Sequence, residues 1–427
     1  MDRRAFLHAA ALAASASAQT PAANEKIQAD RQVALAALQP SDRDLQHGLE
    51  LHADSIVIEP YGFAPRAAID GAIVAQAFER GASDQELDDL MDEMENSRFI
   101  TDSYERQEFL QAWEASGVTC VVQNAGREGM DPLRLLRRLG NFTHALDMMP
   151  DHLVRATGAG DIERAKREGK RALVLSINGV PLPQQWTSVP DELTLVRVFH
   201  QLGVRMMHLT YNRRNMIGSG DGEAVDGGLS DFGRHVIAEM NRLGVLPDVS
   251  HSGRRTSKEA AEASEQPVII SHSACAVLYD HYRSKTDEVI RAVADTGGLM
   301  GVCAVPQFLG GTGDIHAMLN HIDHVVKVAG IDHVAIATDY SYRSRRAGEE
   351  YRKVPQRRRR QPDWEALWPT PLGPTPKSQK TMAWTNWPLF TVGLVQRGYS
   401  DPDIRKIIGE NALRVANTAL PDRAALA

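Results

Sequence analysis

The sequence of 427 residues contains only three cysteines, Cys120, Cys275 and Cys303, and each lies in or beside an apolar run. This scarcity excludes a disulfide framework and indicates buried, unreactive thiols. No segment beyond the N-terminal region is apolar for long enough to cross a bilayer, so no membrane span is expected. The sequence also has no G-x-G-x-x-G motif after its first predicted strand, which argues against a dinucleotide-binding sheet.

Charge of one sign is not in large excess either. The formal net charge is -7, and apolar and charged residues make up 43% and 24% of the chain, which is typical of a globular protein. This balance predicts no nucleic-acid partner and no electrostatic attachment to a membrane. One basic run, Arg357–Arg360, departs from it and is interpreted as a solvated loop, with a binding patch as the alternative.

The N-terminus resembles an export signal. Arg3 and Arg4 form a twin-arginine pattern, a short apolar stretch follows at residues 9–14, and Ala16-Ser17-Ala18 fits cleavage after a small residue. Residues 1–18 are therefore predicted to be a twin-arginine signal peptide, which implies an exported, periplasmic protein. The remainder, residues 19–427, is predicted to be one domain.

Short, β-branched apolar runs alternate with amphipathic stretches along the whole chain. Continuous apolarity in such runs is typical of parallel strands that are covered on both faces. The runs span residues 55–58, 118–123, 172–177, 204–210, 245–250, 267–271, 299–305 and 333–338. About eight strand–helix units favour a closed (β/α)8 barrel over an open sheet. A long loop rich in proline, arginine and tryptophan is expected at about residues 341–386, after the last strand.

Polar side chains close three of these runs. His251 follows the fifth run, His272 follows the sixth, and Asp339 follows the eighth. In a (β/α)8 barrel the carboxyl ends of the strands converge on one mouth, where sites are built. Imidazole and carboxylate are ligands that Zn2+ accepts, so the three residues predict a metal or acid–base site.

Longer motifs around these residues resemble the membrane (renal) dipeptidase family. The motifs are Gly227–Gly233, Glu239–Val245, Asp248–His251, Pro267–Ser273, Ile322–His324, Asp332–Val334 and Gly398–Asn411. They occur in the family's order, and the resemblance covers roughly residues 45–415. It implies a metallo-dependent (β/α)8 barrel that hydrolyses dipeptides with two zinc ions.

The resemblance also implies roles for single residues. His251 and His272 fall on the histidines that hold the second zinc, and Asp339 falls on the catalytic aspartate. Arg283 falls on the arginine that grips the substrate carboxylate, which suits the bidentate fork of a guanidinium.

Several positions depart from the family pattern. The segment His52-Ala53-Asp54 has the spacing of the family's first ligand pair, but it precedes the first run, and we reject it as ligands. Tyr61 and Phe63 stand where those ligands should be, and Asn178 replaces the glutamate that bridges both metals. Tyr211 replaces the histidine that steadies the reaction intermediate. The sequence thus predicts one zinc ion or none.

Three functions remain open from the sequence. The first is a dipeptidase-like hydrolase in which His251 and His272 hold one zinc and Asp339 acts as the base. The second is metal-free acid–base chemistry, such as an isomerisation of a peptidic molecule, and the third is a non-catalytic binding protein. Tyr61 and Asn178 are predicted to contact the small peptidic substrate, whose identity the sequence does not give. Members of the family often form homodimers, and no residue decides whether this chain does.

Overall fold

The computed structural model describes residues 24–127, 131–355 and 377–420, and its centre is a barrel of parallel strands. The strands follow one another around the barrel in chain order, apart from one short extra strand. They are β1 (Ile58–Gly62), β2 (Cys120–Arg127), β4 (Arg171–Asn178), β5 (Val204–His208), β6 (Leu246–Asp248), β7 (Ile269–Ser273), β8 (Leu299–Val302) and β9 (Val334–Ile336). The extra strand, β3 (Leu153–Arg155), pairs with the first residues of β4.

The two ends of the sheet meet just beyond the tips of β1 and β9. The Phe63 amide donates to the Tyr340 carbonyl over 3.3 Å, and the Arg66 amide donates to the Tyr342 carbonyl over 2.8 Å. Backbone groups of the first and last barrel segments are thus paired, which closes the barrel on the side of the strand ends.

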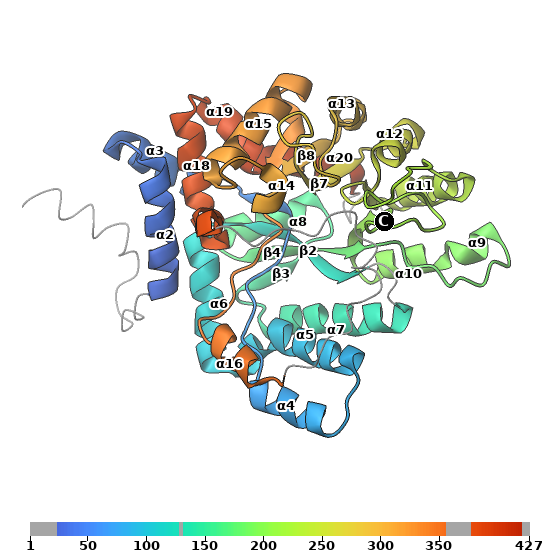
Figure 1. The fold of residues 1–427 in the computed structure, drawn as a ribbon, viewed down its shortest axis with the longest axis horizontal. Coiled ribbons are helices and arrows are strands. Elements are labelled where there is room, and N and C mark those ends of the chain that lie inside the picture. Colours follow the sequence, from blue (N-terminus) through green and yellow to red (C-terminus); the bar gives the residue numbers. More distant parts are fainter. Residues whose placement is uncertain (1–23, 128–130, 356–376, 421–427) are drawn as a thin grey trace, which may run out of the picture.

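Helices that follow the strands cover the outside of the barrel (Figure 1). They are α8 (Ala159–Arg167), α10 (Thr194–Gln201), α11 (Asp231–Leu243), α12 (Arg254–Ala263), α13 (Asp287–Asp295) and α15 (Ile315–Ala329). The C-terminal α20 (Asn411–Ala419) instead adds Val415 and Ala416 to the apolar cluster that contains Met206 and Leu246. The ends of the helices carry the expected signals, as α11 illustrates. The Ser230 side chain accepts from the Gly233 amide at its start, and Gly244, with φ +74°, ends it in the left-handed conformation that glycine tolerates.

Further helices lie around the periphery of the barrel (Figure 1). The N-terminal α2 (Glu25–Leu38) and α3 (Asp42–Asp54) pack against α18 (Trp387–Gln396), near the other end of the chain (Figure 1). Between β1 and β2 the chain forms α4 (Gly71–Glu79), α5 (Asp84–Thr101) and α6 (Ser103–Ser116), and α7 (Pro132–Met148) follows β2. The short helices α9 (Val189–Glu192), α14 (Pro306–Leu309), α16 (Ala347–Lys353) and α19 (Asp401–Arg405) complete the described α-helices.

Side chains inside the barrel change from apolar to polar along the strands. Successive residues of a strand point to opposite faces, so every second residue points inward. Met206 on β5 and Leu246 on β6 belong to a buried apolar cluster inside the barrel. Two residues further along, the same faces carry His208 and Asp248, both with 0% exposure. The barrel therefore has an apolar lower layer and a polar upper layer near the strand ends.

The structure confirms the barrel class and corrects two details of the strand prediction. The first strand begins at Ile58, where the predicted run ended, so Glu59 and Tyr61 lie within the strand. Strand β3 was not predicted, because three residues carry too little pattern. The predicted loop at 341–386 contains α16 and two 3-10 turns, at Lys377–Met382 and Trp384–Asn386. The predicted signal peptide and Arg357–Arg360 lie outside the described residues.

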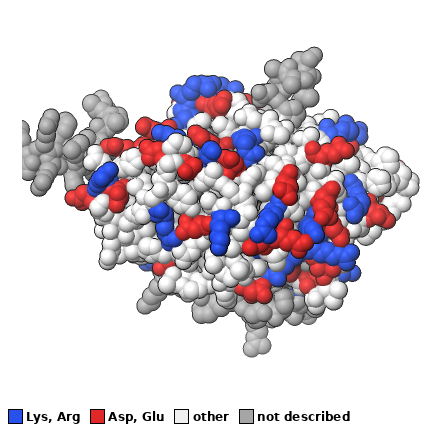
Figure 2. All heavy atoms as spheres, turned by 90° about the horizontal axis from the view of Figure 1, so that it is seen from above, with Lys and Arg blue, Asp and Glu red and all other residues white. Residues whose placement is uncertain are grey.

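Surface charges of both signs are interspersed on the face shown in Figure 2. Many of them form local ion pairs, such as Lys258 with Glu288 over 2.6 Å and Arg255 with Glu259 over 2.7 Å. Within the described part of the chain, no helix is long and apolar enough to cross a membrane.

His52 is a packed residue of α3 at the start of the first strand. Its Nε2 donates to the Ser116 carbonyl over 2.9 Å, and its Nδ1 therefore accepts from the Thr391 hydroxyl over 2.8 Å. Gly117 lies so close that a Cβ atom there would be 2.6 Å from the ring. Burial lowers the pKa of His52 to about 4. His52 is thus a neutral structural residue far from the strand ends.

We predict that His52→Gln destabilises the protein at pH 7.5 by about 1–3 kcal/mol, because a buried hydrogen-bond pair is lost. The unfolded chain protonates His52 near pH 6.5, whereas the folded chain resists protonation until about pH 4. The stability that His52 contributes is therefore present above pH 6.5 and declines as the pH falls towards 4, by up to about 1.4 kcal/mol per unit. Urea unfolding at several pH values measures this decline as a narrowing gap between the two proteins.

The exposed His47, paired with Asp401 on the surface, provides the control. His47→Gln should change the free energy of unfolding by less than about 1 kcal/mol at either pH. A gap between wild type and His52→Gln that stays constant from pH 7.5 to 5 would contradict the assignment.

Candidate active site

A cavity of about 680 Å³ opens at the carboxyl ends of the barrel strands. Tyr61, Asn178, Tyr211, His251 and Asp339 all line it, so the structure brings these predicted site residues together. They come from β1, β4 and the segments after β5, β6 and β9. Convergence from five strands follows from the parallel barrel, which places every carboxyl end at the same rim.

His251 lines this cavity, and its ring faces that of His272, which is fully buried behind the cavity wall. Their Nε2 atoms are 3.1 Å apart. The Nδ1 of His251 donates to Asn212 Oδ1 over 2.6 Å, so its Nε2 carries a lone pair. Burial lowers the pKa of both imidazoles well below the usual value, and the Arg283 cation adds to the effect. Two neutral, oriented imidazoles are the form in which histidine binds a metal.

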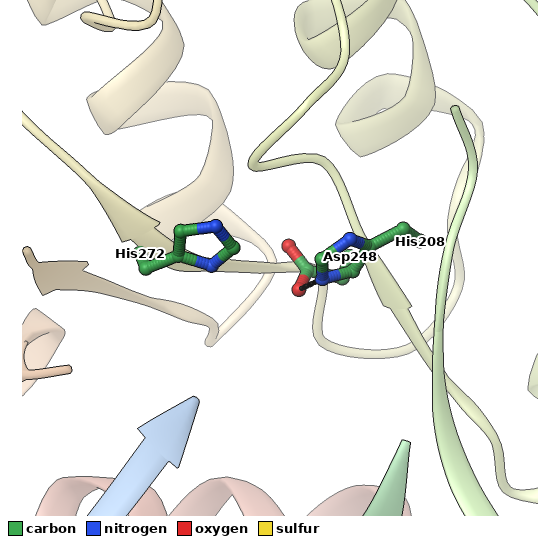
Figure 3. Close-up of side chains that lie close together, drawn as sticks. All are labelled: His208, Asp248 and His272. Carbon is green, nitrogen blue, oxygen red and sulfur yellow. Dashed lines mark ion pairs between the residues drawn. The ribbon is translucent and has the colours of Figure 1, made fainter. Parts of the chain in front are cut away.

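Beneath this pair lies a second polar group, formed by His208, Asp248 and His272 (Figure 3). The Oδ1 atom of Asp248 accepts from the Ser250 amide over 2.9 Å, the Ser250 hydroxyl over 2.7 Å and the Ser271 amide over 3.2 Å. Its Oδ2 forms an ion pair with His208 Nε2. Burial opposes ionisation, but His208 and the hydrogen bonds hold the pKa of Asp248 below its usual range. Sequence reasoning missed His208 because it lies inside an apolar run.

The end of β1 is filled by aromatic rings where the family resemblance implied metal ligands. Tyr61 stacks on His272, with ring centres 4.0 Å apart and planes within 14°. Its hydroxyl donates to Asn178 Oδ1 over 2.9 Å and accepts from Asn124 Nδ2 over 3.1 Å. Phe63 packs edge-on against Tyr61, and the Arg66 guanidinium lies 4.6 Å from the centre of the Phe63 ring.

These residues could not act as ligands for the first zinc ion of a two-zinc site. A phenol whose pKa is raised well above its usual value by burial, a phenyl ring and an engaged amide offer no anionic ligand. The guanidinium of Arg66 would also repel a cation at this position. His251 and His272, by contrast, bring two imidazole nitrogens within 3.1 Å of each other, and neutral imidazole nitrogens are ligands that zinc accepts.

Asp339 lies at the cavity wall in a strained conformation, with φ +59°. Its Oδ2 is 4.0 Å from His272 Nε2. Burial raises its pKa to about 7, an effect that Arg283 and Arg66 partly oppose. A carboxyl group that titrates near neutral pH can accept and return a proton, which is the property of a general base.

Glu59 holds the backbone next to Asp339. It is fully buried, and its Oε1 accepts from the Thr338 amide over 2.9 Å and from the Thr338 hydroxyl. Its Oε2 accepts from Trp384 Nε1 over 2.7 Å, and burial raises its pKa to about 8. Glu59 thereby links β1, the end of β9 and the segment at Trp384. This contact could not be predicted from the sequence, because the three residues are far apart in the chain.

Tyr211 and Arg283 occupy different positions relative to the cavity. The Tyr211 ring lies 4.4 Å from that of His251 and lines the cavity. Arg283 is only 2% exposed, and its Nη1 donates to Asp221 and to the Ser250 carbonyl. Its Nη2 is 3.4 Å from His251 Nε2, so the cation lies behind the histidine pair. The guanidinium groups that line the cavity belong to Arg66, Arg138 and Arg343.

Comparisons with known proteins agree with this geometry. The model of the membrane dipeptidase family (peptidase family M19) matches residues 109–355. An uncharacterized dipeptidase of Schizosaccharomyces pombe is 34% identical over 183 residues, which are 41% of this chain and 42% of that protein. The match thus spans less than half of that relative's length.

Two solved structures cover most of the chain. An amidohydrolase from Pseudomonas aeruginosa superposes with a TM-score of 0.65 at 27% identity, over 88% of this chain and 99% of the other. A probable dipeptidase from the same organism superposes with a TM-score of 0.63 at 19% identity, over 88% and 98% of the two chains. The second likeness shows a shared barrel fold.

We predict that Trp384→Phe destabilises the protein by about 1–3 kcal/mol more than Trp113→Phe does, because it leaves an oxygen of the buried Glu59 without its donor. Both indoles are 2% exposed and pack edge to face with centres 5.2 Å apart. Trp113 Nε1 has no hydrogen-bond partner among the described residues, so that variant loses only ring volume. Urea unfolding measures the difference, and equal losses in the two variants would refute the role of the hydrogen bond.

Proposed function

The chain belongs to the membrane dipeptidase family, peptidase family M19, and from this premise we propose that it is a dipeptidase-like hydrolase that works with at most one zinc ion. Its substrate would be a dipeptide or a similar small molecule with a free carboxylate. The observation that carries the proposal is the pair of neutral imidazoles, His251 and His272, beside a carboxyl group, Asp339, whose pKa lies near 7.

His251 and His272 would hold the ion. When bound, zinc would supply Lewis acidity next to the scissile amide. Asn212 contributes by fixing the tautomer of His251, since a histidine that donates from Nδ1 presents its Nε2 lone pair to the ion.

Asp339 would take a proton from the attacking water as the water oxygen bonds to the amide carbon. It would then return this proton to the leaving amine as the carbon–nitrogen bond breaks. Tyr211, at the same wall of the cavity, would donate a hydrogen bond to the carbonyl oxygen as negative charge develops there. Its phenol can do this without a positive charge, in place of the family's histidine.

The substrate carboxylate would be bound on the cationic side of the cavity. Arg283 remains the residue that the family resemblance indicates, although its guanidinium is paired with Asp221. Arg66 and Arg343 share the carboxylate of Glu95, at 3.0 and 2.9 Å, and both line the cavity. Together with Tyr61 and Asn178, these groups favour a small anionic ligand over a neutral one.

A further proposal concerns the location of the protein in the cell. The twin-arginine pattern of residues 1–18 leads us to propose export to the periplasm, although these residues lie outside the described part.

Isomerisation of a peptidic substrate is the second candidate reaction, and it is favoured by the aromatic residues that fill the position of the first zinc. Assays of a dipeptide library that monitor both free amino acids and epimerised dipeptides distinguish the two reactions.

We predict that Asp339→Asn lowers kcat for dipeptide hydrolysis by about 10²–10⁴-fold, because an amide cannot accept the proton of water. The melting temperature should stay close to that of the wild type. Asp280→Asn removes an exposed carboxylate that pairs with Arg254 and should leave kcat unchanged. Hydrolysis by Asp339→Asn at the wild-type rate would exclude Asp339 as the base.

We also predict that the wild-type protein, purified without chelator and dialysed against Zn2+, retains no more than one zinc per chain. The triple variant Tyr61→His, Phe63→Asp, Asn178→Glu introduces the ligand types that the family resemblance implies, and its zinc content should rise to two. Elemental analysis measures both values. Two tightly bound ions in the wild type would show that the aromatic end of β1 does not exclude the first site.

A further inference from the structure

We propose that His208, Asp248 and His272 form a binding site for a divalent transition-metal ion inside the barrel, on the β5–β6–β7 side. This inference rests on the proposed function in keeping a single ion and departs from it in one ligand set: His208 and Asp248 would bind that ion with His272, in place of His251. It depends on that function only for its catalytic meaning, since metal binding can be measured without a substrate.

The three side chains converge from three neighbouring strands. Strands β5, β6 and β7 lie next to one another in the sheet. Each residue offers one ligand atom, and these atoms all lie within 4.8 Å of one another. Among the described residues, these three side chains form the cluster of His, Cys, Asp or Glu whose spacing would allow it to hold a metal ion. Figure 3 shows the two imidazoles on either side of the Asp248 carboxylate.

The hydrogen bonds around Asp248 leave one oxygen for a cation. Its Oδ1 accepts three donors, from Ser250 and Ser271, which indicates an ionised carboxylate. Its Oδ2 contacts His208 Nε2, but among the described residues neither atom makes a well-oriented hydrogen bond, and His208 Nδ1 makes none. The ion pair with His208 compensates the buried carboxylate without a well-oriented hydrogen bond, and a cation that both side chains bound would supply the missing interaction.

Charge also favours this position over the one between His251 and His272. The Arg283 guanidinium lies 3.4 Å from His251 Nε2 and would repel an ion there. The pair His251 and His272 brings no negative charge of its own, whereas Asp248 supplies a carboxylate. Two imidazoles and one carboxylate are a ligand set that zinc accepts with a fourth position left open. His251 lies beside the site, with its ring 5.2 Å from that of His208, and it also lines the cavity.

The sequence changes at the barrel mouth fit this relocation. The family's ligands at the ends of the first and third predicted strands are replaced by Tyr61, Phe63 and Asn178, and these close one side of the mouth. His208 adds an imidazole on β5, two residues above the apolar Met206 on the same inward face of that strand. An ion bound by His208 would therefore depend on β5, β6 and β7 and on no residue of β1 or β4.

The test is metal binding by the full-length protein, stripped with a chelator and titrated with Zn2+ against a chelating dye, and with Co2+ monitored by visible absorption. Asp248→Asn and His208→Gln should each weaken Zn2+ binding at least about 100-fold, since loss of even an outer-shell partner costs 10–100-fold. His251→Gln is the matched control, because it removes a neighbouring imidazole that the proposed site does not need. Its affinity should change by less than about 10-fold.

The reverse pattern, with binding lost in His251→Gln and retained in His208→Gln, would place the ion between His251 and His272 and overturn the proposal. Absence of Zn2+ and Co2+ binding by the wild type would overturn it as well. If His208→Gln fails to fold, anomalous diffraction at the zinc edge from wild-type crystals decides the question by locating the ion. Dipeptide hydrolysis is assayed separately. Zinc binding through His208 without hydrolysis would refute the proposed function alone, and hydrolysis by His208→Gln with zinc bound would refute this inference alone.

Discussion

The buried carboxylate of Asp248 is the constraint around which the upper part of the barrel is arranged. An anion with no solvent access requires compensation from its neighbours, and three strands supply it. Ser250 comes from the segment just after β6, Ser271 comes from β7, and His208 comes from β5. Arg283 is tied to the same network, since it donates to the Ser250 carbonyl. The relative positions of β5, β6 and β7 are therefore fixed by polar contacts as well as by packing.

The aromatic end of β1 can be understood from the same balance of charge. Two zinc ions require several carboxylates, and this chain has neutral groups at those positions. The Tyr61 hydroxyl both donates to Asn178 and accepts from Asn124, so the phenol and the two amides satisfy one another without any cation. The flat face of Tyr61 covers His272, which removes that imidazole from solvent. The anionic ligands are lost and the site is filled by Tyr61 together, because a cavity lined by unpaired polar groups would destabilise the fold.

The sequence was sufficient to predict the barrel and most of the residues at its mouth. Apolar runs mark strands that are buried on both faces, and a polar residue after such a run points to the functional end of the barrel, as His251 and Asp339 do. The rejection of His52 followed from chain direction alone, since it precedes its strand. His208 could not be found in this way, because a histidine inside an apolar run has the same pattern whether it points into the barrel or outwards. Only the register of β5 places it beside Asp248.

The contacts that tune Asp339 were beyond the reach of the sequence for a different reason. The pKa of a carboxyl group depends on burial and on charges brought close by the fold. Arg66 comes from the loop after β1 and Arg283 from the segment after β7, and both act on Asp339. Burial dominates, so the carboxyl group remains partly protonated at neutral pH although two cations are near. A metal ion next to His272 would add a third positive charge and would lower the pKa of Asp339 further. The position of the ion and the protonation of the base are thus coupled.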